Sequence, residues 1–248
     1  MDELFMYGSE MFIKNKSFVI IEASKFNSQY IKIELNPKYQ QIQQNQQHQN
    51  KPTKMNGFYE IIYKSPSFHI DGLTFETPWM YINKPMYRVN ADNEKNYIEL
   101  TFKNIENDSQ IQQFFHILQD LDKYLINYFT HINQQFLFGK NIRMAELPFI
   151  KLKLNIIQKY VEFNNVKFLN IRHFFDSVDI SNSVAKCFIH CSGIWNYNGR
   201  FGMSWKIIAM KINKDVDSPI SADSEIENAS EIQIPLFEYD ADSSDEAL

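Results

Sequence analysis

The sequence predicts an α+β fold with a mainly antiparallel sheet, one long amphipathic helix and a disordered acidic C-terminal tail. Short apolar or alternating segments, typical of strands, lie on both sides of a single long segment with helical spacing. Strand and helix patterns do not alternate along the chain, which argues against a doubly wound nucleotide-binding fold. The 248 residues are 44% hydrophobic, enough for one body with its own core, which we expect over residues 1–214. Its strands can form an open sheet or close into a barrel.

The N-terminal half contains four predicted strands. Residues 18–21 and 58–63 are short, mainly apolar segments. Residues 30–35 and 97–103 alternate between apolar and polar side chains, so each is expected to bury one face.

Two segments of this half are expected to be irregular. The Gln-rich segment 40–54 cannot bury enough apolar area to offset the entropy of ordering it, which predicts a disordered insert. Pro66, Pro78 and Pro85 interrupt residues 64–96 and predict an irregular segment there.

Residues 109–129 predict the long helix. Asp108 or Ser109 can cap its N-terminus. Its apolar residues recur at helical spacing and form one stripe, made of Ile111, Phe114, Phe115, Leu118, Leu121, Leu125 and Phe129. A second, weaker helix or a loop is expected over residues 131–138.

Strand patterns return after Pro148. Residues 149–154 place Ile150, Leu152 and Leu154 on the inner face and two lysines on the outer face. Residues 160–168 predict a hairpin around Asn164 and Asn165. Residues 185–212 predict two long strands joined by a tight turn at Asn198–Gly199.

Charge is distributed unevenly along the chain. Residues 215–248 hold eleven acidic residues and no Lys or Arg. The remaining 214 residues hold 25 basic and 19 acidic residues, a net charge of +6. A basic body with an acidic tail is typical of nucleic-acid-binding proteins, although a solubilising tail would look the same.

Motifs of the common enzyme classes are missing from the sequence. It contains no P-loop, no dinucleotide-binding motif, no zinc-protease motif and no serine-hydrolase motif. No run of 18 apolar residues and no secretory signal pattern occur, and the two cysteines suggest no disulfide framework. We therefore expect a non-enzymatic, intracellular protein without a membrane partner.

Three small clusters could carry chemistry, and each has a simpler explanation. Cys187, His190 and Cys191 could bind zinc, but a structural site needs four ligands, so buried thiols and an ordinary His are favoured. His116 and Asp120 lie four residues apart on the helix, which a solvated pair explains. Asp176 and Asp179, near His173, are a weak candidate for a metal-dependent nuclease site. We expect no metal and no cofactor.

Two segments, 79–88 and 193–206, combine aromatic and basic residues. Proteins that bind single-stranded nucleic acid stack bases on aromatic rings inside a basic groove. The candidate binding residues in these segments and on neighbouring strands are Trp79, Tyr81, Lys84, Tyr87, Arg88, Tyr97, Lys103, Lys151, Lys153, Trp195, Tyr197, Arg200, Phe201 and Lys206. In the alternative interpretation, Trp195 and Trp205 form a cross-strand pair in the core.

The arrangement of these elements resembles a known family. Residues 93–103 are followed directly by the helix at 109–129, the hairpin segment 193–206 carries Trp and Gly, and the chain ends in Phe237, Glu238, Tyr239 and further acids. This is similar to single-stranded-DNA-binding proteins, more narrowly to those of large nucleocytoplasmic DNA viruses, including the poxvirus type. The resemblance implies an OB-like barrel that binds single strands without strong sequence preference; the Gln-rich insert departs from it.

The leading functional hypothesis is therefore single-stranded-DNA binding in replication, recombination or repair. The acidic tail would compete with DNA for the basic groove and recruit replication proteins. A homo-oligomer is compatible with this hypothesis, and a viral protein would act in the host cytoplasm or nucleus. The alternatives are a structural or interaction protein without nucleic-acid binding, and a divergent nuclease that uses Asp176 and Asp179.

Overall fold

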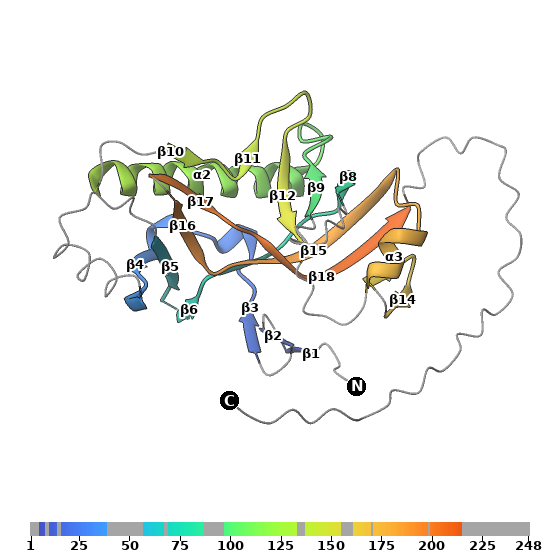
Figure 1. Cartoon of the computed structure of the whole chain (residues 1–248), viewed down its shortest axis with the longest axis horizontal. Helices are drawn as coiled ribbons and strands as arrows, with labels where there is room; N and C mark the ends of the chain where they lie inside the picture. Colours follow the sequence, from blue (N-terminus) through green and yellow to red (C-terminus); the bar gives the residue numbers. More distant parts are fainter. Residues whose placement is uncertain are drawn as a thin grey trace, which may run out of the picture. The chain divides into compact units, whose positions relative to one another are not determined.

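The computed structural model describes residues 5–7, 10–13, 16–38, 57–66, 69–86, 97–132, 137–154, 161–169, 171–197 and 199–214 (Figure 1). The chain divides into two units, Met1–Asp215 and Val216–Leu248, and the described residues all lie in the first. Within them, the strands form sheets of three, six and nine strands, and most neighbouring strands are antiparallel. The fold is therefore α+β with a mainly antiparallel arrangement and one long helix, as the sequence predicts.

Five strands of the nine-stranded sheet pair in a closed ring. The ring runs β8–β9–β12–β18–β15 and returns to β8. A single parallel pair between β12 and β18, Lys153 opposite Lys206, closes it. The strands of the sheet are β7 (Leu73–Glu76), β8 (Met80–Met86), β9 (Tyr97–Thr101), β11 (Ile142–Arg143), β12 (Phe149–Lys153), β13 (Val161–Phe163), β14 (Val166–Phe168), β15 (Ser183–Cys191) and β18 (Lys206–Lys214).

The six-stranded sheet continues from the ring through two strand pairs. Strand β15 leads into β16 at Ser192, and β17 leads into β18 at Ser204–Trp205. The strands of this sheet are β4 (Ile31–Leu35), β5 (Gly57–Lys64), β6 (His69–Asp71), β10 (Leu137–Gly139), β16 (Gly193–Tyr197) and β17 (Arg200–Met203). At the crossing, a Cβ on Gly193 would come within 2.1 Å of the Tyr59 carbonyl oxygen, so only glycine allows the two backbones to approach this closely.

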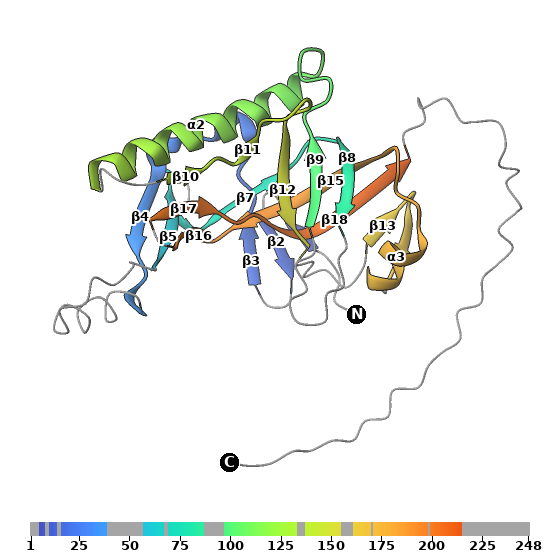
Figure 2. The ribbon, with the colours of Figure 1, turned by 45° about the horizontal axis from the view of Figure 1, so that its top comes forward.

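Helix α2 (Ser109–Ile132) lies along both the ring and the six-stranded sheet (Figure 2). It begins where the Asp108 carboxylate accepts hydrogen bonds from the backbone N–H groups of Gln110 and Ile111, at 2.8 and 3.0 Å. Near its start, Phe114 stacks with Phe102, which follows β9. Near its end, the Phe129 ring lies 4.4 Å from the Phe201 ring of β17. The predicted apolar stripe thus covers parts of both sheets.

The outer edge of the six-stranded sheet is covered by two tyrosines of α2. The hydroxyl groups of Tyr124 and Tyr128 donate to the carbonyl oxygens of Ile31 and Ile33 in β4, at 2.8 and 3.3 Å. These carbonyls are two residues apart on the edge strand, and the tyrosines are four residues apart on one face of the helix. Carbonyl groups that could pair with another strand are therefore satisfied within the chain.

A buried polar network joins α2 to the point where β17 leads into β18. The Asp122 carboxylate accepts hydrogen bonds from the Asn141 backbone N–H at 3.0 Å and from its Nδ2 at 2.6 Å. The Asn141 Oδ1 in turn accepts a 2.7 Å bond from Trp205 Nε1. Burial raises the pKa of Asp122 from 3.8 to about 6, because the loss of hydration outweighs these hydrogen bonds.

The remaining elements are short. The N-terminal strands β1 (Phe5–Tyr7), β2 (Glu10–Ile13) and β3 (Lys16–Val19) form the three-stranded sheet, and Phe18 packs on Ile208 of the ring. Two 3₁₀ turns (Ala23–Lys25 and Ser28–Tyr30) follow β3, and α3 (Ile171–Ser177) precedes β15.

Several local predictions from the sequence are wrong. Segment 64–96 is not irregular throughout, because β6, β7 and β8 lie in it. Pro85 lies inside β8 where the pairing with β9 changes register, a position at which a missing N–H is tolerated. Helix α2 continues three residues past Phe129, and β10 begins at Leu137, where we expected a second helix or a loop. The two long strands at 185–212 are each divided between two sheets.

Other predictions are confirmed or fall outside the described residues. The hairpin β13–β14 turns at Asn164 and Asn165, which have φ values of 47° and 67°. The insert at 40–54 and the acidic tail at 215–248 both lie wholly outside the described residues.

The Asp122 network predicts a pH-dependent contribution to stability. Its pKa is higher in the folded chain than in the unfolded chain, so the folded chain binds more protons between about pH 4 and pH 6. The contribution of Asp122 to the free energy of unfolding should therefore fall as pH rises through this range, by at most about 3 kcal/mol. Urea unfolding at pH 4.5 and pH 7 should show the wild-type chain losing stability relative to Asp122→Asn as pH rises. A difference that does not change with pH, or the same change in the exposed control Asp120→Asn, would contradict this account.

Candidate nucleic-acid interface

The outward face of β8, β9 and β12 gathers several of the predicted binding residues. Side chains alternate along each strand, so Ile98, Leu100, Ile150 and Leu152 fill the core at 0% exposure. The intervening side chains of β9 and β12 point away from the core. They are Tyr97, Glu99, Phe149, Lys151 and Lys153, which are half-buried or exposed, and Thr101, which is buried.

Strand register orders these side chains into rows. One row crosses four strands, β11, β12, β9 and β8. Its members, in that order, are Arg143, Phe149, Thr101 and Tyr81. In the next rows along β12, Lys151 lies opposite Glu99 and Lys153 lies opposite Tyr97. We call this surface the basic face and define it by Tyr81, Tyr97, Lys103, Arg143, Phe149, Lys151 and Lys153.

Two lysines of the basic face lie over aromatic rings. Lys103 Nζ is 4.1 Å from the centre of the Tyr81 ring, and Lys151 Nζ is 4.2 Å from the centre of the Tyr97 ring. Each contact is worth roughly 0.5–1 kcal/mol at a partly exposed site, enough to hold the ammonium group beside the ring. Cationic and aromatic groups are therefore paired before any ligand arrives.

The basic face continues to the closure of the ring. Lys206 of β18 lies opposite Lys153 in the parallel pair, and it also lies opposite His190 in β15. Both lysines are close enough to Cys191 to lower the pKa of its buried thiol, although burial dominates and raises that pKa to about 11. Glu99 is the carboxylate that the register places on this face, so positive charge predominates there.

A second aromatic surface lies on the six-stranded sheet, on the face opposite the one that contacts Phe129. Trp195 lies opposite Phe58 of β5 and Gly202 of β17, and Tyr197 lies opposite Arg200. We call Phe58, Trp195, Tyr197 and Arg200 the aromatic platform. Trp195 and Tyr197 are 39% and 60% exposed, and Arg200 is exposed.

Gly202 determines how Trp195 lies. A Cβ on Gly202 would come within 2.5 Å of the indole Cζ2 and 2.9 Å of Cε2, so the ring lies directly against the strand backbone. Its Nε1 donates to the Met203 carbonyl oxygen at 3.4 Å. The other side of the indole remains partly open to solvent.

The structure places the candidates predicted from the sequence in different parts of the fold. Five of them lie on the basic face, namely Tyr81, Tyr97, Lys103, Lys151 and Lys153, and Lys206 lies beside them. Trp195, Tyr197 and Arg200 lie together on the aromatic platform. Trp79 precedes β8 and is half-buried. Tyr87 and Arg88 lie outside the described residues, and the side chain of Lys84 is not described.

Phe201 does not reach the surface. It is 3% exposed and packs against Phe129 and Tyr59, so it cannot serve as a stacking surface in this fold. Trp195 and Trp205 are not a core pair, because Trp205 is buried and bonded to Asn141 while Trp195 lies on the surface.

Sequence reasoning missed three residues of these surfaces. Phe149 alternates with Ile150, which could have placed it on the lysine-bearing side of its strand. Arg143 is recognisable only from the pairing of β11 with β12. Phe58 joins the platform through a strand pair that spans more than 130 residues of sequence.

The other chemical candidates take part in ordinary local contacts. Cys187 and Cys191 are buried, and the Thr74 hydroxyl lies 2.9 Å from His190 Nδ1. Asp120 forms a 3.0 Å ion pair with Lys123 on the exposed side of α2. The Asp179 carboxylate accepts a hydrogen bond from the Ser181 backbone N–H at 2.9 Å. Among the described residues, no group of three His, Cys, Asp or Glu side chains could hold a metal ion.

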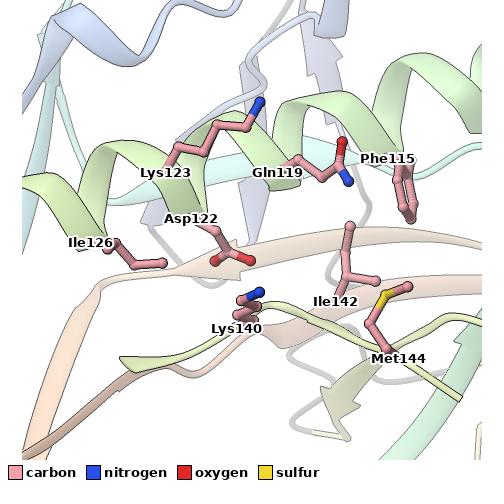
Figure 3. Close-up of a pocket in the computed structure, with 8 residues that line it drawn as sticks. All are labelled: Phe115, Gln119, Asp122, Lys123, Ile126, Lys140, Ile142 and Met144. Atoms are coloured by element: carbon pink, nitrogen blue, oxygen red, sulfur yellow. The ribbon is translucent and has the colours of Figure 1, made fainter. Parts of the chain in front are cut away.

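A small pocket lies between α2 and the β10–β11 segment (Figure 3). Asp122 points from the helix toward Lys140, and Phe115, Ile142 and Met144 gather at the other end. Its volume is about 170 Å³, below the roughly 300–1,000 Å³ of most small-molecule sites. Because the Asp122 carboxylate is held by Asn141, the pocket is best described as a gap beside the buried network.

Comparison with known proteins found similarity to solved structures. No protein-family model and no curated protein sequence matches the chain. The fold is similar to the crystal structure of gp2.5, a single-stranded DNA binding protein encoded by bacteriophage T7. The match has a TM-score of 0.40 and 15% identity, and it covers 62% of this chain and 98% of that chain. It is a phage protein, so the narrower poxvirus-type resemblance gains no support from it. None of the helices described is long and apolar enough to cross a membrane.

The contact between Gly202 and Trp195 predicts the effect of one methyl group. In Gly202→Ala the new Cβ should push the indole off the strand, shift Trp195 emission to the red and lower the free energy of unfolding by about 1 kcal/mol. Gly139→Ala is the matched control, because Gly139 pairs with Gly202 and its Cβ would meet the nearest atom at an ordinary 3.5 Å. Emission spectra and urea unfolding of both variants provide the test. Equal spectra for the two variants would show that the ring does not lie on Gly202.

Proposed function

We propose that this protein is a non-enzymatic, single-stranded-nucleic-acid-binding protein and that its basic face holds the strand. The observation that supports this proposal most directly is the contact of Lys103 with Tyr81 and of Lys151 with Tyr97 on one face of the sheet. The lysines and Arg143 would contact phosphates, and the tyrosines and Phe149 would contact bases. Neither kind of contact reads base identity, so binding would have little sequence preference.

The mixture of charge and aromatic rings favours single strands over duplex. A duplex offers phosphates to the lysines, but its bases are already stacked and paired. An unpaired base can lie on a Tyr ring, which contributes roughly 1–3 kcal/mol per base. We propose DNA as the strand, and RNA of the same sequence is a necessary comparison.

We further propose that the five-stranded ring is an OB-like barrel. In an OB-fold, a five-stranded Greek-key barrel binds oligonucleotides on the face of its second and third strands. The second and third ring strands in chain order are β9 and β12, and they carry Tyr97, Lys151 and Lys153. The position of the basic face on these strands supports the proposal.

In the cell, such a protein would act in replication, recombination or repair. The eleven acids of residues 215–248 would then recruit replication proteins with basic surfaces.

A role in protein interaction is the second candidate, favoured by one specific observation. Val166, the first residue of β14, is 58% exposed, and Leu169, which follows β14, is 74% exposed. Strand β14 pairs with β13 at the end of the nine-stranded sheet. Exposed apolar side chains at a strand edge are typical of a surface that binds another chain. This candidate predicts no salt-dependent nucleic-acid binding.

Binding should depend on the lysines of β12. Fluorescence anisotropy with a labelled dT oligonucleotide should show Lys151→Gln/Lys153→Gln binding about tenfold more weakly at low salt. Each lost phosphate contact lowers the slope of log affinity against log salt by about 0.7, so the slope should fall by about 1.4. The matched control is Lys25→Gln/Lys123→Gln, which removes the same charge from exposed lysines paired with Glu22 and Asp120.

Three results would overturn the proposal. They are absence of binding by the wild-type chain at low salt, equal losses in the two double variants, and equal affinity for a duplex of the same length. Equal losses would mean that net charge, and not the basic face, determines binding.

A further inference from the structure

We propose that the aromatic platform is a second surface that binds unpaired bases. Stacking would provide most of its binding energy, whereas charge would provide most of the binding energy of the basic face. This inference rests on the proposed function and deepens it. The sequence suggested one groove, but the register places Trp195, Tyr197 and Arg200 on a different sheet from Tyr97, Lys151 and Lys153.

The indole of Trp195 is held flat against the sheet. The indole of Trp195 lies on Gly202, where any side chain would occupy its position, and its Nε1 is bonded to the Met203 carbonyl oxygen. The Phe58 ring, from the residue opposite Trp195, reaches within 2.7 Å of where a Cβ on Gly193 would stand. Two glycines on adjacent strands thus make room for two aromatic rings. A ring fixed in this way loses little rotational freedom when a base stacks on it.

The charges around the platform suit one strand path. Arg200 lies directly opposite Tyr197 and can reach a phosphate next to a stacked base. On the other side, Glu60 lies opposite Gly193 and Glu34 lies opposite Glu60. Lys32 forms an ion pair with Glu34, so Arg200 is the charge that would guide a polyanion, and its path would run over β16 and β17.

The exposed area fits bases better than a protein partner. Trp195 and Tyr197 at 39% and 60% exposure present on the order of 200 Å² together. A stable protein interface needs about 800 Å² per partner. One or two bases need only a ring-sized surface and a nearby cation, and both are present.

The two surfaces should respond differently to salt. Charge contacts weaken as counterions compete, but stacking changes little. In Trp195→Ala and Tyr197→Ala, affinity for a dT oligonucleotide should fall roughly 5- to 100-fold with an unchanged salt slope. This is the opposite of the expectation for Lys151→Gln/Lys153→Gln, whose slope should fall.

The closing experiment combines anisotropy with intrinsic fluorescence. Trp195→Phe should bind within about twofold of the wild type and lose most of the fluorescence quenching caused by DNA. Gly202→Ala, which keeps every platform side chain but displaces the ring, should bind more weakly than its matched control Gly139→Ala. Because Gly139 and Gly202 face each other on β10 and β17, the pair separates ring position from a general effect on the sheet. Leu169→Ala controls for the loss of an exposed apolar side chain elsewhere.

Each result leads to a different conclusion. Wild-type affinity in both Trp195→Ala and Tyr197→Ala, with binding still dependent on Lys151 and Lys153, would overturn the platform and leave the proposed function standing. No binding by the wild-type chain would overturn both. Unchanged DNA affinity together with a change in oligomeric state, measured by light scattering, would show that the platform binds a second copy. If Trp195→Ala does not fold, Tyr197→Ala and Gly202→Ala decide the question.

Discussion

Helix α2 is the constraint on which the rest of the structure depends, because its apolar stripe is longer than either sheet can cover. A helix of 24 residues is about 36 Å long. Phe114 packs on Phe102 next to the ring, and Phe129 packs on Phe201 of the six-stranded sheet. Burying the whole stripe therefore requires both sheets to meet the same helix. The Asp122–Asn141–Trp205 network lies where β17 leads into β18, and it fixes the helix at the boundary between the sheets.

This arrangement determines which surfaces remain open. On the six-stranded sheet, the helix covers Phe201 and Tyr59 and leaves the opposite face to Trp195 and Tyr197. On the ring, Phe18 of the N-terminal strands packs on Ile208 and His190, so these strands cover part of β15 and β18. The two candidate surfaces are the parts of each sheet that these packing partners do not cover. One carries mostly cations and the other mostly rings, so their contributions to binding can be separated experimentally.

Local patterns predicted those features that local physics determines. Alternation around Ile150 and Leu152 placed Lys151 and Lys153 outward, and the apolar stripe defined α2 to within three residues of its C-terminal end. The left-handed pair Asn164–Asn165 identified its hairpin. Pairing between distant segments could not be predicted in this way. Strand β8 pairs with β15 about 100 residues away, and that pairing makes a proline-containing segment extended.

For the candidate site too, local patterns predict some features, and the pairing of distant strands determines the others. The candidates predicted from the sequence include residues of both surfaces, but the sequence suggested a single groove, because alternation does not reveal where a strand passes from one sheet to another. Phe201 illustrates the limit. It alternates correctly with its neighbours, yet only the position of Phe129 decides that its face is buried.

The closure of the ring has a consequence for the link between ligand and folding. Lys153 and Lys206 lie side by side at the single pair that joins β12 to β18, and two like charges in that position repel each other. The backbone N–H of Lys153 nevertheless bonds to the Trp205 carbonyl oxygen at 2.9 Å, which holds the strands together. A polyanion bound across these two ammonium groups would relieve the repulsion at the single residue pair that closes the ring. A ligand that binds the closed ring more tightly than the unfolded chain would stabilise it, so the stability of the ring would depend on what is bound to it.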